Sequence, residues 1–148
     1  MKLIFCSSNL IGALLIKAVT WSKWSHVAIL IDDDTAIEAV HPKVRYVSVA
    51  ELKAKYKNWC IVDVPVDDEA AAITYAKSQI SKPYDYTALI GIFFHRDWGD
   101  PSDWYCAELA ASTIVNGGKK LFRRKFISRI VPQHLWMMDF DILETPWE

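Results

Sequence analysis

The feature that most constrains the fold is a pair of short apolar runs joined by three consecutive aspartates. The first run, residues 26–31, is continuous and rich in β-branched side chains, which is typical of a core strand. Residues 32–34 supply a turn, and Thr35–Val40 forms a second apolar run. Two such runs joined by a short turn pair antiparallel. The sequence therefore predicts a β-hairpin in the core.

The remaining elements follow from hydrophobic periodicity. Pro65 indicates an edge or the end of a strand, and Asp103 is placed to cap a helix that begins near Cys106. Predicted strands lie at about residues 3–5, 44–49, 59–66 and 139–144; predicted helices lie at about 9–19, 50–57, 67–80, 84–94 and 106–116, with a helical turn at 132–136. No repeat or linker divides the chain, so we expect one domain over residues 1–148.

Composition excludes several classes of protein. A chain of 148 residues with 52% hydrophobic residues can bury a sizeable core without disulfides or metals. The formal net charge of -1 creates no field for a polyanion, and the basic run at 119–125 is short, so we expect no nucleic-acid partner. Three cysteines without a CxxC pair indicate neither a disulfide framework nor a zinc knuckle. We expect no metal and no cofactor.

The apolar runs are too short to cross a membrane, which requires about 20 apolar residues. The N-terminal apolar run is interrupted by polar residues, and Cys6 comes too early for an ordinary lipoprotein leader to precede it. Because free thiols suit a reducing compartment, we expect a cytoplasmic protein without a transmembrane segment.

Cys106 is the first candidate for a chemical role. It stands in the stretch Trp104-Tyr105-Cys106-Ala107-Glu108, at what the pattern predicts to be the first turn of a helix. Backbone N–H groups and the positive end of the helix dipole there favour a thiolate, the form that attacks carbonyl carbon. The alternative is a buried cysteine that acts as a small hydrophobe.

A cysteine nucleophile needs a base, and His26 is placed to be one because it opens a core strand directly after a loop. Glu38 lies on the returning strand and can accept the second imidazole N–H. If the hairpin turn centres near Asp32, Glu38 comes directly opposite His26; if it centres between Asp33 and Asp34, His41 takes that place instead. The register stays open between these two.

Four stretches together resemble a known family. They are Trp24-Ser25-His26-Val27-Ala28-Ile29, Ala36-Ile37-Glu38-Ala39, Pro83-Tyr84-Asp85, and Trp104-Tyr105-Cys106-Ala107-Glu108-Leu109. Their order is similar to that of the circularly permuted NlpC/P60 papain-like family, the YiiX/YaeF-type cysteine peptidases and amidases. The similarity runs from about residue 3 to about residue 135.

The resemblance implies an α+β, permuted papain-like fold, with a central antiparallel sheet packed against helices that include the nucleophile helix. It implies that Cys106 is the nucleophile, His26 the base and Glu38 the orienting residue. It also implies that Tyr84 lines the site or helps to bind the oxyanion. One departure is visible, since the family commonly has Ser where this chain has Ala107. Glu108 matches the family, and we interpret it as a structural hydrogen-bonding partner.

The leading hypothesis is a thiol hydrolase that cleaves an amide or peptide bond, by family analogy in a cell-wall peptide or a similar small amide. Aromatic residues near the site are candidates for a substrate groove, with core packing as the alternative; they are Trp21, Trp24, Trp98, Trp104 and Tyr105. Competing hypotheses are an acyl-transfer enzyme such as a lipid acyltransferase, thioesterase or phospholipase, and a non-catalytic binding module. A metal site formed by Cys106, His26 and Glu38 lacks the close spacing typical of structural zinc.

Overall fold

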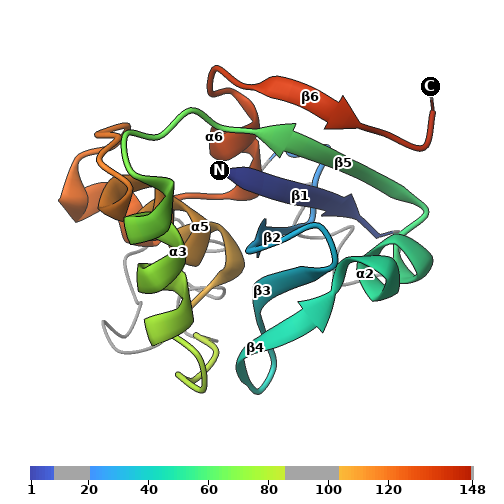
Figure 1. Ribbon diagram of the computed structural model, residues 1–148, viewed down its shortest axis with the longest axis horizontal. Helices are drawn as coiled ribbons and strands as arrows, with labels where there is room; N and C mark the ends of the chain where they lie inside the picture. Colours follow the sequence, from blue (N-terminus) through green and yellow to red (C-terminus); the bar gives the residue numbers. More distant parts are fainter. Residues whose placement is uncertain (9–20, 86–103, 148) are drawn as a thin grey trace.

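The computed structural model describes residues 1–8, 21–85 and 104–147, which form a mixed α+β fold around an open antiparallel sheet (Figure 1). The predicted helix at 9–19 and most of the one at 84–94 lie outside these residues. In the described part of the chain the sheet has six strands in the order β4-β3-β2-β1-β5-β6. The strands are β1 (Lys2–Ser7), β2 (His26–Leu30), β3 (Thr35–Val40), β4 (Lys43–Ser48), β5 (Asn58–Asp63) and β6 (Asp141–Glu144).

Helices cover the two faces of the sheet unequally. On one face, α5 (Cys106–Asn116) packs against β2 and β3, and α3 (Glu69–Ser78) packs on α5. On the other face, α2 (Val49–Lys55) closes a smaller core through Leu52. Figure 1 shows α3 and α5 on one side of the molecule and α2 on the other. The described chain also contains η1 (Arg124–Arg129) and α6 (Pro132–Trp136).

The two cores follow from the alternation of strand side chains. In β2, Val27 and Ile29 join the larger core with α5, whereas Ala28 and Leu30 join the smaller core with α2. A strand buried on both faces reads as a continuous apolar run, as residues 26–31 do. The sequence pattern therefore reflects the position of β2 in the interior of the sheet.

Helix α5 is the most deeply buried helix among those described. Small residues at 107, 110 and 111 are all buried, which lets its backbone approach its neighbours closely. At its C-terminal end, a Cβ added to Gly117 would lie 3.0 Å from the Cβ of Ala72 and 3.1 Å from that of Val66. A larger residue at this position would therefore push the neighbouring side chains apart by a few tenths of an ångström where the end of α5 meets the chain around α3.

Most predicted elements in the described residues are confirmed to within a few positions. The hairpin is formed by β2 and β3, and β5 ends at Asp63, before Pro65. The predicted cap at Asp103 is wrong, because the N-cap of α5 is Tyr105, which supplies no side-chain cap hydrogen bond. The N-cap of α3, in contrast, is Asp68, whose carboxylate accepts a hydrogen bond from the Ala71 N–H.

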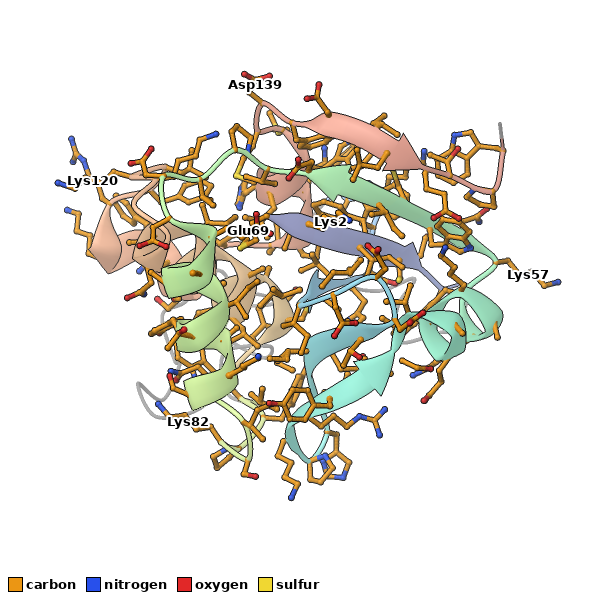
Figure 2. All side chains as sticks on the ribbon, viewed as in Figure 1. Lys2, Lys57, Glu69, Lys82, Lys120 and Asp139 are labelled. Atoms are coloured by element: carbon orange, nitrogen blue, oxygen red, sulfur yellow. The ribbon has the colours of Figure 1, made fainter. Side chains whose placement is uncertain are left out.

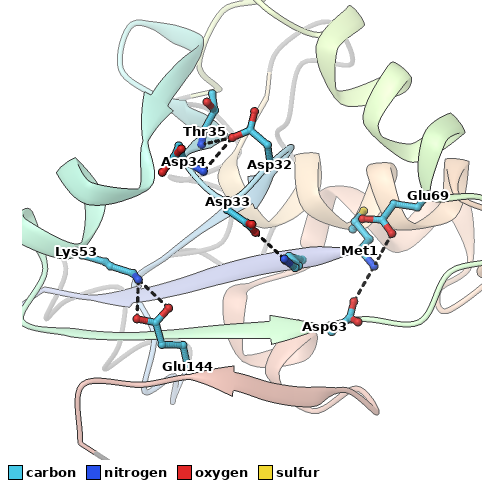
Figure 3. A network of polar contacts seen from close by, with 10 residues as sticks. Met1, Asp32, Asp33, Asp34, Thr35, Lys53, Asp63, Glu69 and Glu144 are labelled. Atoms are coloured by element: carbon cyan, nitrogen blue, oxygen red, sulfur yellow. Dashed lines mark hydrogen bonds and ion pairs between the residues drawn. The ribbon is translucent and has the colours of Figure 1, made fainter.

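Charged groups gather at the periphery, as the labelled side chains Lys57, Lys82, Lys120 and Asp139 illustrate (Figure 2). Two sets of polar contacts stabilise the turn between β2 and β3 and the position of the edge strand β6 (Figure 3). The Asp32 carboxylate accepts hydrogen bonds from the N–H groups of Asp34 and Thr35, at 2.9 and 2.7 Å, and so closes the hairpin turn. The Lys53 ammonium lies 2.7 Å from the Glu144 carboxylate and ties α2 to β6. In the part of the chain that the structure describes, no helix has the length and apolar character of a membrane span.

Candidate active site

The candidate site lies where β2 begins and α5 begins. His26 is the first residue of β2, and Cys106 is the first residue of α5. The neighbouring strand β3 contributes Glu38, and β4 contributes Arg45. Because all four side chains come from regular elements, the sheet and the helix fix their relative positions.

His26 and Glu38 are hydrogen-bonded. The distance between His26 Nε2 and Glu38 Oε2 is 2.8 Å, and the Glu38 side chain has 0% exposure to solvent. The Nε2 position of the ring is therefore engaged, and Nδ1 is the ring nitrogen that remains for a second partner.

The hairpin register differs from both predicted alternatives. Ile29 pairs with Ile37 and Leu30 with Ala36, so the pairing centres on Asp33. Continued along the strands, this register sets Glu38 across from residue 28, and neither Glu38 nor His41 lies directly opposite His26. Glu38 reaches the imidazole diagonally on the same face of the sheet, a distance that a long side chain can span. His41 is exposed at the turn after β3.

Arg45 is the residue of this cluster that sequence reasoning missed. It pairs directly with Glu38 in the β3–β4 ladder. Its Nε and Nη2 donate to Glu38 Oε1 at 3.0 and 2.8 Å. The turn predicted at residues 41–43 gave the wrong signal, because counting back from it aligns position 38 with position 46. The observed turn contains only residues 41 and 42, and it aligns positions 38 and 45.

These contacts change the pKa values of both partners. Burial alone raises the pKa of Glu38, but hydrogen bonds and charges from His26 and Arg45 outweigh it and lower the pKa from 4.5 to about 2. Burial lowers the pKa of His26, but hydrogen bonds and charges at Cys106 and Glu38 outweigh it and raise the pKa from 6.5 to about 9. The cluster therefore favours a charged carboxylate beside an imidazolium.

Cys106 is buried and influences the imidazole of His26. Its exposed fraction is 4%, and hydrogen bonding to its thiol is among the causes that raise the pKa of His26. As the first residue of α5, it lies where backbone N–H groups have no acceptor within the helix. The structure thus brings together Cys106, His26 and Glu38, the three residues predicted to act together.

Tyr84 is held next to the start of α5. The Asp85 N–H donates to the Trp104 carbonyl at 3.1 Å, and the Trp104 N–H donates to the Pro83 carbonyl at 2.9 Å. Tyr84 itself is half-buried, and burial, followed by the charge of Cys106, raises the pKa of its hydroxyl. This segment therefore lies beside the residues that lead directly into α5.

Tyr105 lies inside the protein beside the thiol. It is 1% exposed, and its hydroxyl interacts with the Cys106 thiol. Burial, followed by the charges of Cys106 and Tyr84, raises the pKa of this hydroxyl well above its ordinary value. Contact between Tyr105 and a substrate stays a prediction.

The predicted tryptophan groove receives no support from the described indoles. Trp24 is fully buried and packs against Phe5 and Trp136, at ring distances of 5.9 and 4.9 Å. Trp104 is buried, and its Nε1 donates to Gln79 Oε1 of α3 at 3.1 Å. Both follow the core-packing alternative, and their role in substrate binding stays a prediction. Trp21 is exposed, and Trp98 lies outside the described residues.

Two further residues enclose His26. The Tyr56 ring, directly after α2, stacks on the imidazole at 5.9 Å with an interplanar angle of 22°. Cys6 pairs with His26 across the β1–β2 ladder and is fully buried, which raises the pKa of its thiol. The imidazole is therefore shielded from water on several sides and held in one orientation.

No protein-family model matches the chain, and no curated protein matches it. Among solved structures, the chain is similar to the crystal structure of the metalloprotein YiiX from Escherichia coli O157:H7, DUF1105. The TM-score is 0.76 with 17% sequence identity, over 99% of this chain and 97% of that chain. At this identity the likeness shows a shared fold over the whole length.

YiiX is a metalloprotein, so the side chains of this chain that could bind a metal ion are of interest. The described residues contain no group of three or more His, Cys, Asp or Glu side chains that could hold one. Glu38 engages Arg45 with one oxygen and His26 with the other, and a guanidinium beside a carboxylate disfavours a second cation there. The donors around Glu38 therefore do not fit a metal centre.

Proposed function

We propose that this chain is a thiol hydrolase that cleaves an amide or peptide bond through an acyl-enzyme on Cys106. The observation that carries the proposal is the single imidazole of His26, which bonds Glu38 through Nε2 and interacts with the Cys106 thiol. A nucleophile, a base and a group that orients the base are the parts that this chemistry needs. The 99% coverage by the YiiX structure supports the fold expected for such an enzyme.

The proposed reaction has two halves. His26 takes the thiol proton, and the Cys106 sulfur attacks the substrate carbonyl carbon to give a tetrahedral intermediate. The imidazolium then returns the proton to the leaving nitrogen, the carbon–nitrogen bond breaks, and a thioester remains. In the second half, His26 takes a proton from water, the hydroxide adds to the thioester, and the acid product leaves as the Cys106 thiol is restored.

Glu38 acts on the imidazole and not on the substrate. Its carboxylate accepts the Nε2–H and so directs the other nitrogen to the thiol. Its negative charge also stabilises the imidazolium that forms during each half-reaction. The raised pKa of His26 and the lowered pKa of Glu38 agree with this division of roles.

The oxyanion of the tetrahedral intermediate needs hydrogen-bond donors. Backbone N–H groups in the first turn of α5 are one source, because the N-cap supplies no side chain to occupy them. The Tyr84 hydroxyl is a second source, since its segment is tied to Trp104 directly before the helix. Ala107 is fully buried in α5, so the departure from the family Ser removes a hydroxyl from the interior and leaves the backbone donors in place.

The proposal includes a permuted papain-like fold in a single domain over residues 1–148, with the base on a strand that precedes the nucleophile helix. The sheet order and the position of Cys106 at the start of α5 support it. It also includes a cytoplasmic location, supported by three free cysteines, Cys6, Cys60 and Cys106.

Covalent labelling tests the nucleophile directly. The full-length protein is treated with iodoacetamide near neutral pH, and the modified cysteine is identified by mass spectrometry. We expect Cys106 to react faster than a model thiol, although it is 4% exposed, and the Cys60→Ser variant to react like the unmodified protein. A Cys106 thiol that reacts no faster than a model thiol would favour the non-catalytic binding module.

A substrate panel separates amide from ester chemistry. Peptide amides and acyl esters are offered to the wild-type protein and to Cys106→Ala, and acyl-enzymes are trapped by mass. Amide turnover that disappears in Cys106→Ala supports the proposal. Turnover of esters alone, with a lipid acyl group on Cys106, would contradict the amidase assignment and support the acyl-transfer alternative.

A further inference from the structure

We propose that Arg45 is a positioning residue of this site, which fixes the Glu38 carboxylate so that one of its oxygens points at His26. The inference rests on the proposed function and adds a fourth member to the Cys106, His26 and Glu38 group. Arg45 acts through Glu38 and touches neither the thiol nor the substrate in the mechanism above.

The geometry of the ion pair carries the inference. Both Nε and Nη2 of Arg45 donate to the same oxygen, Oε1 of Glu38, at 3.0 and 2.8 Å. The other oxygen, Oε2, is thereby left to His26 Nε2, at 2.8 Å. Two donors on one oxygen restrict rotation of the carboxylate more than a single contact does. Arg45 therefore occupies one oxygen of the Glu38 carboxylate and leaves the other oxygen for His26.

The sheet holds this ion pair in register. Glu38 and Arg45 are direct partners in the β3–β4 ladder, so their side chains start from adjacent points on the same face. Glu38 has a side-chain exposure of 0%, whereas Arg45 is 44% exposed. The guanidinium thus covers a buried carboxylate at its outer side, which removes the cost of an uncompensated buried charge.

The other charged or titratable groups around Glu38 cannot replace Arg45. Those described are His26 on β2, Cys6 on β1 and Tyr56 after α2. The Glu51 carboxylate of α2 lies 4.0 Å from Arg45 Nη2. Of these, His26 must gain and lose its charge during the reaction, and the rest are neutral or negative. The Lys55 ammonium of α2 lies over the Tyr56 ring at 5.1 Å, and the ion pairs of Glu38 among the described residues are with His26 and Arg45. Arg45 is therefore the partner of Glu38 whose positive charge persists at every working pH.

A purely structural role for Arg45 makes a different prediction. If the guanidinium only strengthened the β3–β4 edge, its removal would lower stability and leave the pH dependence of Cys106 reactivity unchanged. If it positions and charges Glu38, its removal lets the buried carboxyl take a proton at a higher pH. The imidazolium then loses its counter-ion on the acid side of neutrality, and the thiol loses reactivity there.

The test measures alkylation of Cys106 by iodoacetamide in the full-length protein, read by intact mass from about pH 5 to about pH 8. The variants are Arg45→Met, Arg45→Lys and Lys43→Met, the last an exposed cation two residues away on β4. In Arg45→Met we expect the ratio of the rates at about pH 5.5 and about pH 7.5 to fall about tenfold, because the buried carboxyl without its guanidinium takes up a proton within this pH range. Arg45→Lys keeps the charge and should retain most of the ratio.

Chemical rescue gives a second readout. Because Arg45 is 44% exposed, free guanidinium should enter the gap left in Arg45→Ala and restore the acid-side reactivity, whereas sodium at the same ionic strength should not. Circular dichroism confirms folding of each variant, and a variant that fails to fold is replaced by Arg45→Gln.

The outcomes distinguish the two proposals. A reactive wild-type Cys106, with an Arg45→Met profile that matches the wild type at every pH, overturns the role of Arg45 and leaves the thiol hydrolase standing. A wild-type Cys106 that reacts no faster than a model thiol overturns the proposed function and the inference with it. An acid-side loss in Arg45→Met, absent in Lys43→Met and reversed by guanidinium, supports both.

Discussion

At the scale of the residue, one imidazole organises the site. His26 bonds a fully buried carboxylate on one side, interacts with a thiol on the other, and has an aromatic ring stacked on its face. Glu38 in turn is held by Arg45. The contacts run from the exposed Arg45 through the buried Glu38 carboxylate and the His26 imidazole to the Cys106 thiol, so a change at one residue alters the environment of the next.

Replacing Glu38 by Gln should lower amide turnover and Cys106 alkylation near neutral pH by about a hundredfold or more. The amide keeps the size of the side chain but removes the charge that stabilises the imidazolium. Glu51→Gln, which removes an exposed carboxylate 4.0 Å from Arg45, is the matched control and should stay near the wild-type rate. Equal rates for the two variants would mean that Glu38 does not act on His26.

The pH dependence of stability follows from the two shifted groups. The pKa of Glu38 is lowered from 4.5 to about 2, so its stabilisation is present above about pH 4.5 and is lost as pH falls through about 2. The pKa of His26 is raised from 6.5 to about 9, so its stabilisation is present below about pH 6.5 and is lost as pH rises through about 9.

Urea unfolding at a series of pH values should therefore show both contributions in full between about pH 4.5 and about pH 6.5. In His26→Gln the decline between about pH 6.5 and about pH 9 should become shallower than in the wild type. An unchanged alkaline slope in this variant would contradict the assigned shift of His26.

At the scale of the element, the sequence predicts helices and strands that depend on neighbouring residues and misses contacts between residues on different strands. The hairpin, α3 and the start of α5 are each encoded by a continuous pattern of their own residues. The register of β2 and β3 was not, because three aspartates fit several turn centres and the choice depends on the Asp32 side chain bonding Asp34 and Thr35. Arg45 was missed for a related reason, since its role exists only once β4 pairs with β3.

The C-terminal end of α5, which packs closely against the chain around α3, gives a test at this scale. Gly117→Ala should destabilise the fold by about 1 to 3 kcal/mol, because the new Cβ would lie 3.0 Å from the Ala72 Cβ and 3.1 Å from the Val66 Cβ. Asn116→Ala, one residue earlier and exposed, is the control and should cost less. Urea unfolding measures both, and a Gly117→Ala variant as stable as the wild type would show that α3 and α5 can separate without cost.

At the scale of the whole molecule, the sheet carries two cores of different size. The site residues on β2, β3 and β4 lie on the face that α2 closes, whereas α5 delivers Cys106 from the face with the larger core. Both helical layers must therefore be packed for the thiol to meet the imidazole. The comparison with YiiX, at a TM-score of 0.76, indicates that this two-layer arrangement persists at low sequence identity.

The smaller core should contribute to stability more than its size suggests. Leu52→Ala, which empties a position that is 1% exposed, should lower the free energy of unfolding by about 2 to 5 kcal/mol. The adjacent Lys53→Ala breaks a partly exposed ion pair with Glu144 and should cost about 1 kcal/mol or less. A Leu52→Ala cost no larger than that of Lys53→Ala would mean that α2 is not needed to close this face.

The separation of Cys106 from His26 along the chain has a consequence for how the protein folds. The β2, β3 and β4 strands are joined by short turns and can pair early, because their contacts are local. Helix α5 packs against these strands only after the long chain segment between β4 and α5 has brought its two ends together. During refolding, the enhanced alkylation rate of Cys106 should therefore develop later than the sheet signal in circular dichroism. The time at which this enhancement develops would report the last step of assembly.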